Sequence, residues 1–223
     1  MTKTLFITGA SSGIGAATAK TAAASGWNVG LFARSEDKLT ELAKEIGSQA
    51  LVLVGDATDL DAQRDALAQL QAHTGQLDAV FANAGRGSSA PGVAEGDPED
   101  WDGMIDLNIK GALYTAHASM EALKKSRGHF VVTGSVAGRR HLKGSIYGAT
   151  KWFIHGFAGN LAEEMGEWGG RCTVIAPGMV DTAFFDSPKP DKLQPQDVAD
   201  AVVYALNAPE RADVRELCLM PTG

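Results

Sequence analysis

A tyrosine and a lysine in the second half of the chain have the types and the spacing that proton transfer requires. Tyr147 and Lys151 are four residues apart in a stretch that we expect to be helical, so both side chains project from one helix face. A free tyrosine has a pKa near 10, and a nearby cation favours the phenolate. Bringing that pKa to about 7 requires about 4 kcal/mol of differential stabilisation. We therefore expect Lys151 to lower the pKa of Tyr147 and to make it a general acid/base.

Ser135 precedes this pair by twelve residues and directly follows a run that we expect to be a strand. Ligands of open α/β sheets bind at the carboxyl ends of strands, where a serine can hydrogen-bond a substrate oxygen. A Tyr-x-x-x-Lys spacing alone also fits an amphipathic tyrosine beside a surface lysine. The nearby serine and the glycine-rich turn described next make that alternative weaker.

A glycine-rich turn near the start of the chain has the composition of a phosphate-binding loop. The segment 8–15 reads TGASSGIG and lies between a first strand and a first helix. Gly9, Gly13 and Gly15 allow a tight turn, and the helix N-terminus offers free N–H groups to the phosphates of a dinucleotide. The spacing G-x-x-x-G-x-G differs from the commoner G-x-G-x-x-G, and a tight turn without a ligand is the alternative.

The end of the second strand indicates which dinucleotide would bind. A carboxylate there would hydrogen-bond the adenosine ribose of NAD, but the chain has Ala33 followed by Arg34. A guanidinium can clamp a 2′-phosphate and stack on adenine, so we expect NADP(H) to be preferred. Glu36 and Asp37 follow closely, so NAD(H) use is possible, and a solvated Arg34 is the alternative.

Short β-rich runs alternate with alanine-rich helical stretches along the whole chain. Runs of four to six apolar residues without alternation are typical of strands buried on both faces. Strand–helix alternation with right-handed crossovers predicts an α/β, doubly wound parallel sheet with helices on both faces. We expect strands at 5–8, 28–33, 51–54, 78–82, 129–133, 171–176 and 216–219, and helices at 13–25, 36–46, 60–73, 98–106, 109–124, 145–168 and 195–207. No linker or repeat divides the chain, so we expect residues 1–223 to form one domain.

Composition excludes several classes of protein. The 223 residues carry a formal charge of −7, which argues against non-specific nucleic-acid binding. No apolar run approaches the ~20 residues of a membrane helix, and the N-terminus has no signal-peptide pattern. We expect a cytoplasmic protein without nucleic-acid or membrane partners, in which Cys172 and Cys218 are buried and reduced. The five histidines and two cysteines show no metal-ligand spacing, so we expect no metal site.

Together these motifs resemble the short-chain dehydrogenase/reductase family over almost the whole chain. TGASSGIG at 8–15 matches the family's T-G-x-x-x-G-x-G turn, and Ser135, Tyr147 and Lys151 match its catalytic serine, tyrosine and lysine. The other matches are Gly55–Asp59, the Asn83-Ala84-Gly85 motif with Ala82 in place of the usual asparagine, Asn108 within LNIKG, and Pro177–Thr182. The resemblance implies a Rossmann fold with seven strands in the order 3-2-1-4-5-6-7.

The resemblance also implies a role for each matched residue. Ser135 would hold the reacting oxygen, Tyr147 would act as the acid/base, and Lys151 would bind the nicotinamide ribose. Asn108 would set a helix kink and position a water that connects Lys151 to solvent. The catalytic set is therefore Asn108, Ser135, Tyr147 and Lys151. The expected cofactor-binding residues are Gly9, Ser11, Ser12, Gly13, Ile14, Gly15, Arg34, Asp56, Ala57, Asn83, Ala84, Gly85, Tyr147, Lys151, Pro177, Gly178, Val180 and Thr182.

These residues predict an NADP-dependent oxidoreductase that transfers a hydride between nicotinamide and a small-molecule carbonyl/alcohol pair, such as a ketone, aldehyde or quinone. The alternative is a cofactor-binding sensor or scaffold with little or no turnover, because fold alone does not fix function. The intact set of acid/base residues argues against that alternative. The family's usual helix interface implies a homodimer or homotetramer in which Trp152, Phe153 and Phe157 pack in the core or at the interface.

Two loop segments bear on the substrate pocket. The segment 183–194 contains Pro188 and Pro190, so we expect a short loop instead of a helical lid. That reduction, together with the chain's ending soon after its last strand, predicts an open pocket that a neighbouring subunit closes in part or not at all. Arg139, Arg140, His141 and Lys143 form a basic cluster, which we interpret as a solvated loop or as an attractor of anionic substrates.

Overall fold

The computed structural model describes residues 2–88, 92–185 and 187–222. Seven strands form one sheet in the order β3-β2-β1-β4-β5-β6-β7, and every neighbouring pair is parallel. This confirms the expected sheet and its order. The strands are β1 (Thr4–Thr8), β2 (Asn28–Ala33), β3 (Ala50–Val54), β4 (Ala79–Ala82), β5 (His129–Thr133), β6 (Arg171–Pro177) and β7 (Glu216–Leu219).

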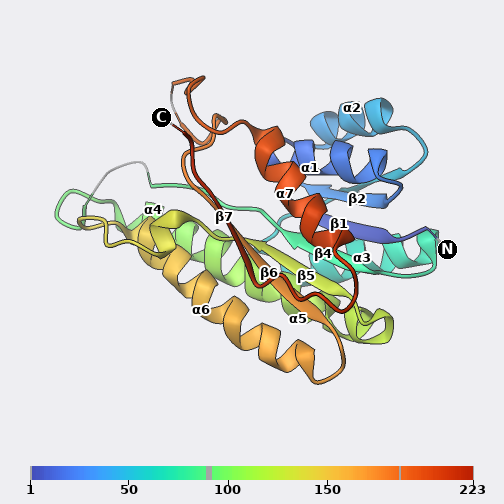
Figure 1. The fold of residues 1–223 in the computed structure, drawn as a ribbon. Coiled ribbons are helices and arrows are strands. Elements are labelled where there is room, and N and C mark those ends of the chain that lie inside the picture. The colour runs from blue at the N-terminus through green and yellow to red at the C-terminus, as the bar shows by residue number, and fades with distance from the viewer. Residues whose placement is uncertain (1, 89–91, 186, 223) are drawn as a thin grey trace.

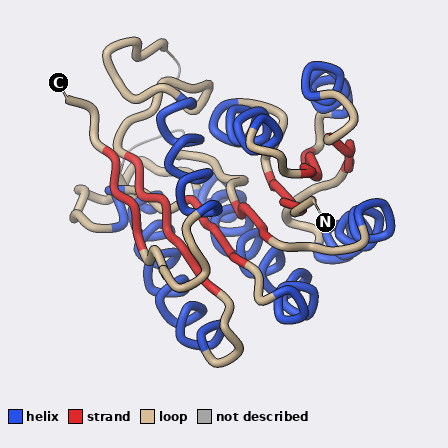
Figure 2. Tube along the Cα trace, turned by 45° about the vertical axis from the view of Figure 1, so that its right-hand side comes forward, coloured by secondary structure: helices blue, strands red, loops and turns tan. Residues whose placement is uncertain are grey.

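Helices cover both faces of this sheet (Figures 1 and 2). One face packs against α1 (Gly13–Ala24), α2 (Glu36–Ile46) and α7 (Pro195–Asn207), and the other against α3 (Leu60–Thr74), α5 (Ala112–Ser126) and α6 (Ile146–Gly166). Within β1 the buried side chains alternate between the two cores: Leu5 and Ile7 enter one, and Phe6 enters the other. Burial on both faces explains why these strands are short apolar runs.

The last crossover has the opposite hand to the others. The chain steps from β5 to β6 and then to β7 in the same direction across the sheet. The helix of the first step, α6, packs on one face, whereas α7 packs beside α1 on the other face. Right-handed connections are the rule for parallel strands, so the β6–α7–β7 connection is left-handed. The expectation of right-handed crossovers throughout is wrong at this one place.

The helix expected at 98–106 and the one expected at 109–124 are joined. A π-helical turn at Asp106–Gly111 connects α4 (Pro98–Ile105) directly to α5. Wide turns of this kind insert an extra residue into a helix and often occur at functional sites. Asp97 caps α4 by accepting from the Glu99 N–H, and Pro98 occupies the first turn, so the start of this helix is encoded locally.

The cysteine expectation holds for one residue and is wrong for the other. Cys172 is buried in β6, whereas Cys218 is exposed. The reason is topological, because Cys218 lies on β7, which is an edge strand of the sheet.

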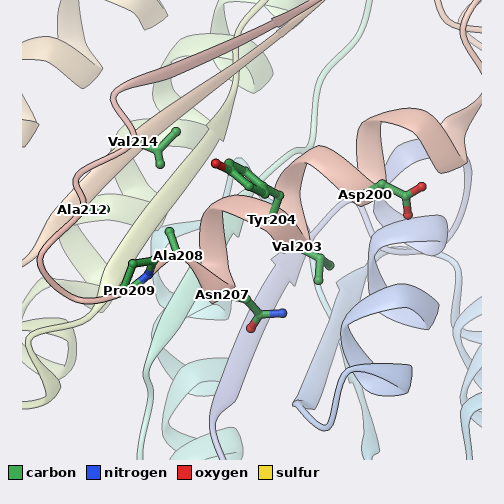
Figure 3. Close-up of a pocket in the computed structure, with 8 residues that line it drawn as sticks. All are labelled: Asp200, Val203, Tyr204, Asn207, Ala208, Pro209, Ala212 and Val214. Carbon is green, nitrogen blue, oxygen red and sulfur yellow. The ribbon is translucent and has the colours of Figure 1, made fainter.

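A hollow of about 440 Å³ lies between α7 and the segment 208–214 that leads to β7 (Figure 3). This segment precedes the amino end of β7, so the hollow is at the edge of the sheet away from the strands' carboxyl ends. Among the described helices none has the length and apolar character needed to cross a membrane.

Candidate active site

Tyr147 and Lys151 lie in the first turns of α6, at the carboxyl edge of the sheet. The Ser145 hydroxyl caps this helix by accepting from the Gly148 N–H at 2.9 Å. The buried Lys151 ammonium donates to the Thr133 carbonyl at the end of β5, at 2.7 Å. Its Nζ lies 5.8 Å from the centre of the Tyr147 ring. The expected i, i+4 arrangement therefore brings the two side chains together.

The electrostatics of this pair differ from the expectation. Burial raises the pKa of Tyr147 above its ordinary value, and a hydrogen bond with Ser135 offsets this only in part. Burial also lowers the pKa of Lys151 to about 8. Desolvation penalises the charged form of each group, and the ammonium is directed to the Thr133 carbonyl. In this structure the phenol is therefore protonated at neutral pH.

Ser135 begins a short 3₁₀ turn, η2 (Val136–Gly138), directly after β5. Its hydroxyl oxygen accepts from the Ala137 N–H at 3.1 Å and lies 3.5 Å from the Pro177 carbonyl. Because Pro177 ends β6, these contacts place Ser135 between the carboxyl ends of two neighbouring strands. This is the position at which ligands of such sheets bind.

Asn108 is buried in the π-helical turn, and its amide joins three segments. Its Oδ1 accepts from the Arg86 N–H at 2.9 Å, and its Nδ2 donates to the Arg86 carbonyl at 2.9 Å. The same Nδ2 donates to the Thr150 hydroxyl at 3.1 Å, one residue before Lys151. A Cβ on Gly85 would lie 3.2 Å from Asn108 Oδ1, so Gly85 also borders this amide. Asn108 thus connects the π turn to α6 and to the loop after β4.

Asn83 ties the glycine-rich turn to the middle of the sheet. Its Nδ2 donates to the Thr8 carbonyl at 3.2 Å, and its Oδ1 accepts from the Thr133 hydroxyl at 3.1 Å. The Thr8 hydroxyl accepts from the backbone N–H groups of Asn83 and Ala84, each at 3.1 Å. Gly9 has a φ of +68°, and a Cβ there would lie 2.9 Å from Ala84 Cα, so only glycine fits this close approach.

The N-terminus of α1 is suited to an anion. Ser12 occupies the cap position without a side-chain cap hydrogen bond, and the first turn contains no acidic residue. By contrast, α3 has an aspartate cap and an acidic first turn. Ser11 and Ser12 line the turn, and Ile14 packs into the core below it. Gly13 faces Thr182 across this turn, since a Cβ on Gly13 would lie 3.3 Å from Thr182 Cγ2. These donors fit the phosphates of a dinucleotide.

Arg34 and Asp56 lie together at the carboxyl ends of β2 and β3. Arg34 Nη1 is 3.8 Å from Asp56 Oδ2, and the Arg34 side chain is 79% exposed. Burial acts to raise the pKa of Asp56, but two hydrogen bonds from Thr58 and the charge of Arg34 together lower it. Ala57, the next residue, is buried, and its carbonyl accepts from Gln63 Nε2 at 2.7 Å. An exposed guanidinium here has room to meet a phosphate.

The segment after β6 closes one side of the site. The Gly178 N–H donates to the Leu219 carbonyl at 2.7 Å, and buried Val180 pairs with Leu193 in a short bridge. The described residues of 183–194 form no helix, as the prolines predict. Phe184 in this segment lies on Tyr147, with ring centres 5.4 Å apart. Openness of the pocket stays a prediction, although one aromatic side chain covers the tyrosine.

Four residues of this site are not predicted from the sequence, and three of them have no signal that identifies them. Thr133 holds Lys151, Thr150 holds Asn108, Phe184 covers Tyr147, and His155 contacts the backbone of Ser135. Each acts through a tertiary contact made by a common residue type. The spacing of His155 from Lys151, four residues along the same helix, is the one sequence pattern that points toward the site.

The basic cluster divides into different contacts. Arg139 forms an ion pair with Glu216 on β7, and His141 stacks on Trp152 with ring centres 5.5 Å apart. Arg140 and Lys143 are exposed. In the part of the chain that the structure describes, no three histidine, cysteine or acidic residues are grouped so that they could hold a metal ion.

Comparison with known proteins agrees with this geometry. The model of the short chain dehydrogenase family matches residues 3–193. An uncharacterized oxidoreductase of Staphylococcus epidermidis is 39% identical over 98% of this chain and 97% of its own length. Among solved structures, an alcohol dehydrogenase from the archaeon Thermococcus sibiricus, complexed with 5-hydroxy-NADP, is 30% identical. Its TM-score is 0.91, with 99% of this chain and 97% of that chain covered.

A serine dehydrogenase from Escherichia coli is also 30% identical, with a TM-score of 0.89, covering 98% of this chain and 97% of that chain. The family match spans most of the sequence, and the relatives align over nearly their full lengths. The chain therefore belongs to the short-chain dehydrogenase family and is an oxidoreductase.

Proposed function

We propose that this enzyme transfers a hydride between NADP(H) and a small-molecule carbonyl/alcohol pair. The observation that carries the proposal is the meeting of Ser135, Tyr147 and Lys151 at the carboxyl edge, beside the anion-suited turn of α1. When bound, the nicotinamide supplies or accepts the hydride. The protein supplies the oxygen contact, the proton and the orientation.

In the proposed reduction, the Ser135 hydroxyl hydrogen-bonds the carbonyl oxygen, and the Tyr147 phenol gives that oxygen its proton as the carbon gains a hydride. The Tyr147 phenol carries the proton that this step needs, because burial keeps it protonated at neutral pH. Lys151 binds the nicotinamide ribose and restores the proton to Tyr147. Asn108 holds the α6 turn that carries Thr150 and Lys151, and so positions the proton path toward solvent.

We propose the following cofactor contacts. The turn residues Gly9 to Gly15 and the Asn83-Ala84-Gly85 segment border the pyrophosphate and the adjacent ribose, and Asp56 and Ala57 border the adenine. Pro177, Gly178, Val180 and Thr182 border the carboxamide. Arg34 binds the 2′-phosphate, which its exposure and its place beside Asp56 support. The 5-hydroxy-NADP complex of the T. sibiricus enzyme also supports an NADP-type ligand.

The test of the reaction is oxidation of NADPH against a panel of ketones, aldehydes and quinones, with NADPH binding measured separately by fluorescence. The proposal predicts tight NADPH binding and turnover with members of the panel. Binding without turnover across the panel would favour the alternative, a cofactor-binding sensor or scaffold.

The substitution Arg34→Ala tests the proposed preference for NADPH over NADH. A charged hydrogen bond contributes about 1.5–3 kcal/mol, so the ratio of kcat/KM for NADPH to that for NADH should fall by roughly 10- to 100-fold. Lys38→Ala, which removes a nearby exposed cation that lies on α2, is the matched control and should leave the ratio within about twofold. A wild-type enzyme that prefers NADH would contradict the role given to Arg34.

We also propose a cytoplasmic homodimer or homotetramer that associates through α6. Trp152 and Phe153 are 43% and 37% exposed on this helix, and Phe153 stacks on Phe157 with ring centres 6.1 Å apart. Gly156 and Gly159 face open space on the same helix, which would let a second helix approach closely. Cell fractionation tests the location.

A further inference from the structure

His155 lies one helical turn after Lys151 and reaches under the Ser135 turn. Its side chain is 3% exposed. The ring atom Nε2 is 3.0 Å from the Ser135 carbonyl oxygen and 3.5 Å from the Ser135 backbone nitrogen. The imidazole therefore contacts the main chain on both sides of the serine whose hydroxyl faces Tyr147.

The ring is wedged between two glycines that flank this turn. A Cβ on Gly134 would lie 2.8 Å from His155 Nε2, and a Cβ on Gly138 would lie 2.6 Å from His155 Cδ2. A side chain at either position would displace the ring. The space that these glycines leave is filled by the imidazole, which fixes the path of the backbone around Ser135.

The far side of the ring faces an ion pair. His155 Nδ1 is 3.7 Å from Glu216 Oε1, and Glu216 on β7 pairs with Arg139, which follows η2. Nδ1 is buried and has no hydrogen-bond partner among the residues that the structure describes. A row of polar groups thus runs from the edge strand β7 to the Ser135 carbonyl, and none of it belongs to the proposed reaction mechanism.

The distances select a tautomer. Nε2 can either donate to the Ser135 carbonyl at 3.0 Å or accept from the Ser135 N–H at 3.5 Å. The carbonyl contact is the shorter, so we assign the proton to Nε2. The neutral ring then presents the Nδ1 lone pair to the Glu216 carboxylate, and protonation at Nδ1 would give Glu216 a charged partner. The charged groups that face the ring are Glu216 from β7, Arg139 from the segment after η2, and Lys151 from α6.

We propose that His155 is a positioning residue, whose Nε2–H hydrogen bond holds the Ser135 turn while its Nδ1 faces Glu216. This inference rests on the proposed function, in which Ser135 holds the reacting oxygen. A displacement of about 1 Å at a group that contacts substrate can lower turnover by about 100-fold. Fixing the main chain on both sides of Ser135 keeps its hydroxyl within reach of Tyr147.

The test compares two variants of similar size. His155→Gln keeps an N–H donor at about the reach of Nε2, and His155→Leu removes it. With a carbonyl substrate from the panel, His155→Leu should lower kcat by about 10- to 100-fold, with the Kd for NADPH within about twofold of wild type. His155→Gln should stay within about threefold of the wild-type kcat. A folded His155→Leu protein with kcat within threefold of wild type would overturn the proposal.

A second arm does not depend on folding of the leucine variant. Glu216→Gln removes the carboxylate that favours the imidazolium, so any limb of the kcat–pH profile due to His155 should move to lower pH. An unchanged profile would contradict the proposed contact between His155 Nδ1 and Glu216. A purely structural contact would alter stability without moving this limb.

A third readout needs no turnover. Long-range ¹H–¹⁵N NMR correlations, assigned by their loss in His155→Gln, should show His155 protonated at Nε2. Protonation at Nδ1 instead would overturn the proposal. If the wild-type enzyme reduces nothing on the panel, the proposed function fails, while the NMR result still decides whether His155 holds Ser135.

Discussion

The placement of Lys151 is unfavourable for folding. Its ammonium is buried, and that burial lowers its pKa to about 8 from an ordinary value of 10.5. Keeping such a lysine charged at neutral pH costs about 3 kcal/mol, because a tenfold change in a protonation equilibrium corresponds to about 1.4 kcal/mol. Functional sites commonly retain groups of this kind at the expense of stability.

Lys151→Met should therefore raise the free energy of unfolding at pH 7 by about 1–3 kcal/mol, the lower values reflecting an unpaired Thr133 carbonyl. In the wild type the unfolded chain binds more protons than the folded one between about pH 8 and pH 10.5, so wild-type stability rises across that window. The difference between the two proteins should shrink there. Urea unfolding at pH 7 and pH 10 measures both effects, and a variant less stable than wild type at pH 7 would refute this account.

The sequence identifies the catalytic side chains but not the environment that surrounds each of them in the fold. The types and spacing of Ser135, Tyr147 and Lys151 are visible along the chain, and the structure brings these side chains together. The direction of the Tyr147 pKa is not visible, because it depends on burial by residues distant in sequence. The contacts of His155 and Phe184 are also tertiary, and only the helical spacing of His155 from Lys151 hints at one of them.

The strands bring the site residues together because their carboxyl ends lie at the same edge of the sheet. Turns after β1, β4, β5 and β6 carry the glycine-rich segment, Asn83, Ser135 and the Pro177 segment in turn. Strand runs and most helix bounds are predictable because burial on both faces produces continuous apolar segments. The π turn and the left-handed β6–α7–β7 crossover are not predictable, since the first depends on the buried Asn108 amide and the second on packing of α7 against α1.

The proposed association of subunits depends on the outward face of α6. Trp152→Glu should break the proposed association, because it places a charge at the centre of an apolar contact. The molar mass from light scattering should fall by half or more, with little change in kcat per subunit. Tyr204→Glu is the matched control, since Tyr204 is an exposed aromatic residue on α7. Loss of association in Tyr204→Glu alone would place the interface on α7 instead.

One sheet runs through the whole molecule and contains strands from both halves of the chain. It lies between two layers of helices (Figure 2). We propose that residues 1–223 unfold as one domain, because α1 from the first half packs on α7 from the second. Coincident unfolding curves from circular dichroism and tryptophan fluorescence would support this, and separate curves would contradict it.

The buried His129 should make the stability of the folded protein sensitive to acid. Burial, with the charges of Arg171 and Lys3, lowers the pKa of His129 to about 3, so the folded protein keeps this residue neutral. Below about pH 6.5, His129 binds a proton in the unfolded chain but not in the folded protein. The free energy of unfolding should therefore decrease by about 1.4 kcal/mol for each unit by which the pH falls, as the contribution of this residue.

His129→Gln should remove that part of the acid sensitivity, since glutamine can replace the hydrogen bond to the Thr173 hydroxyl without titrating. The exposed His73→Gln is the control and should unfold as the wild type does. Urea unfolding between about pH 7 and pH 5 makes the comparison. Equal slopes for His129→Gln and wild type would show that burial of His129 is not responsible.

In the proposed NADP(H)-dependent carbonyl/alcohol reaction Tyr147 transfers the proton, and Tyr147→Phe removes the hydroxyl that carries it. The measurement is kcat with the best carbonyl of the panel, together with the Kd for NADPH. We expect kcat to fall by about 100-fold or more, because general acid catalysis of this kind contributes about 10²–10⁴, while the Kd stays within about twofold. A kcat within tenfold of the wild-type value would contradict the claim.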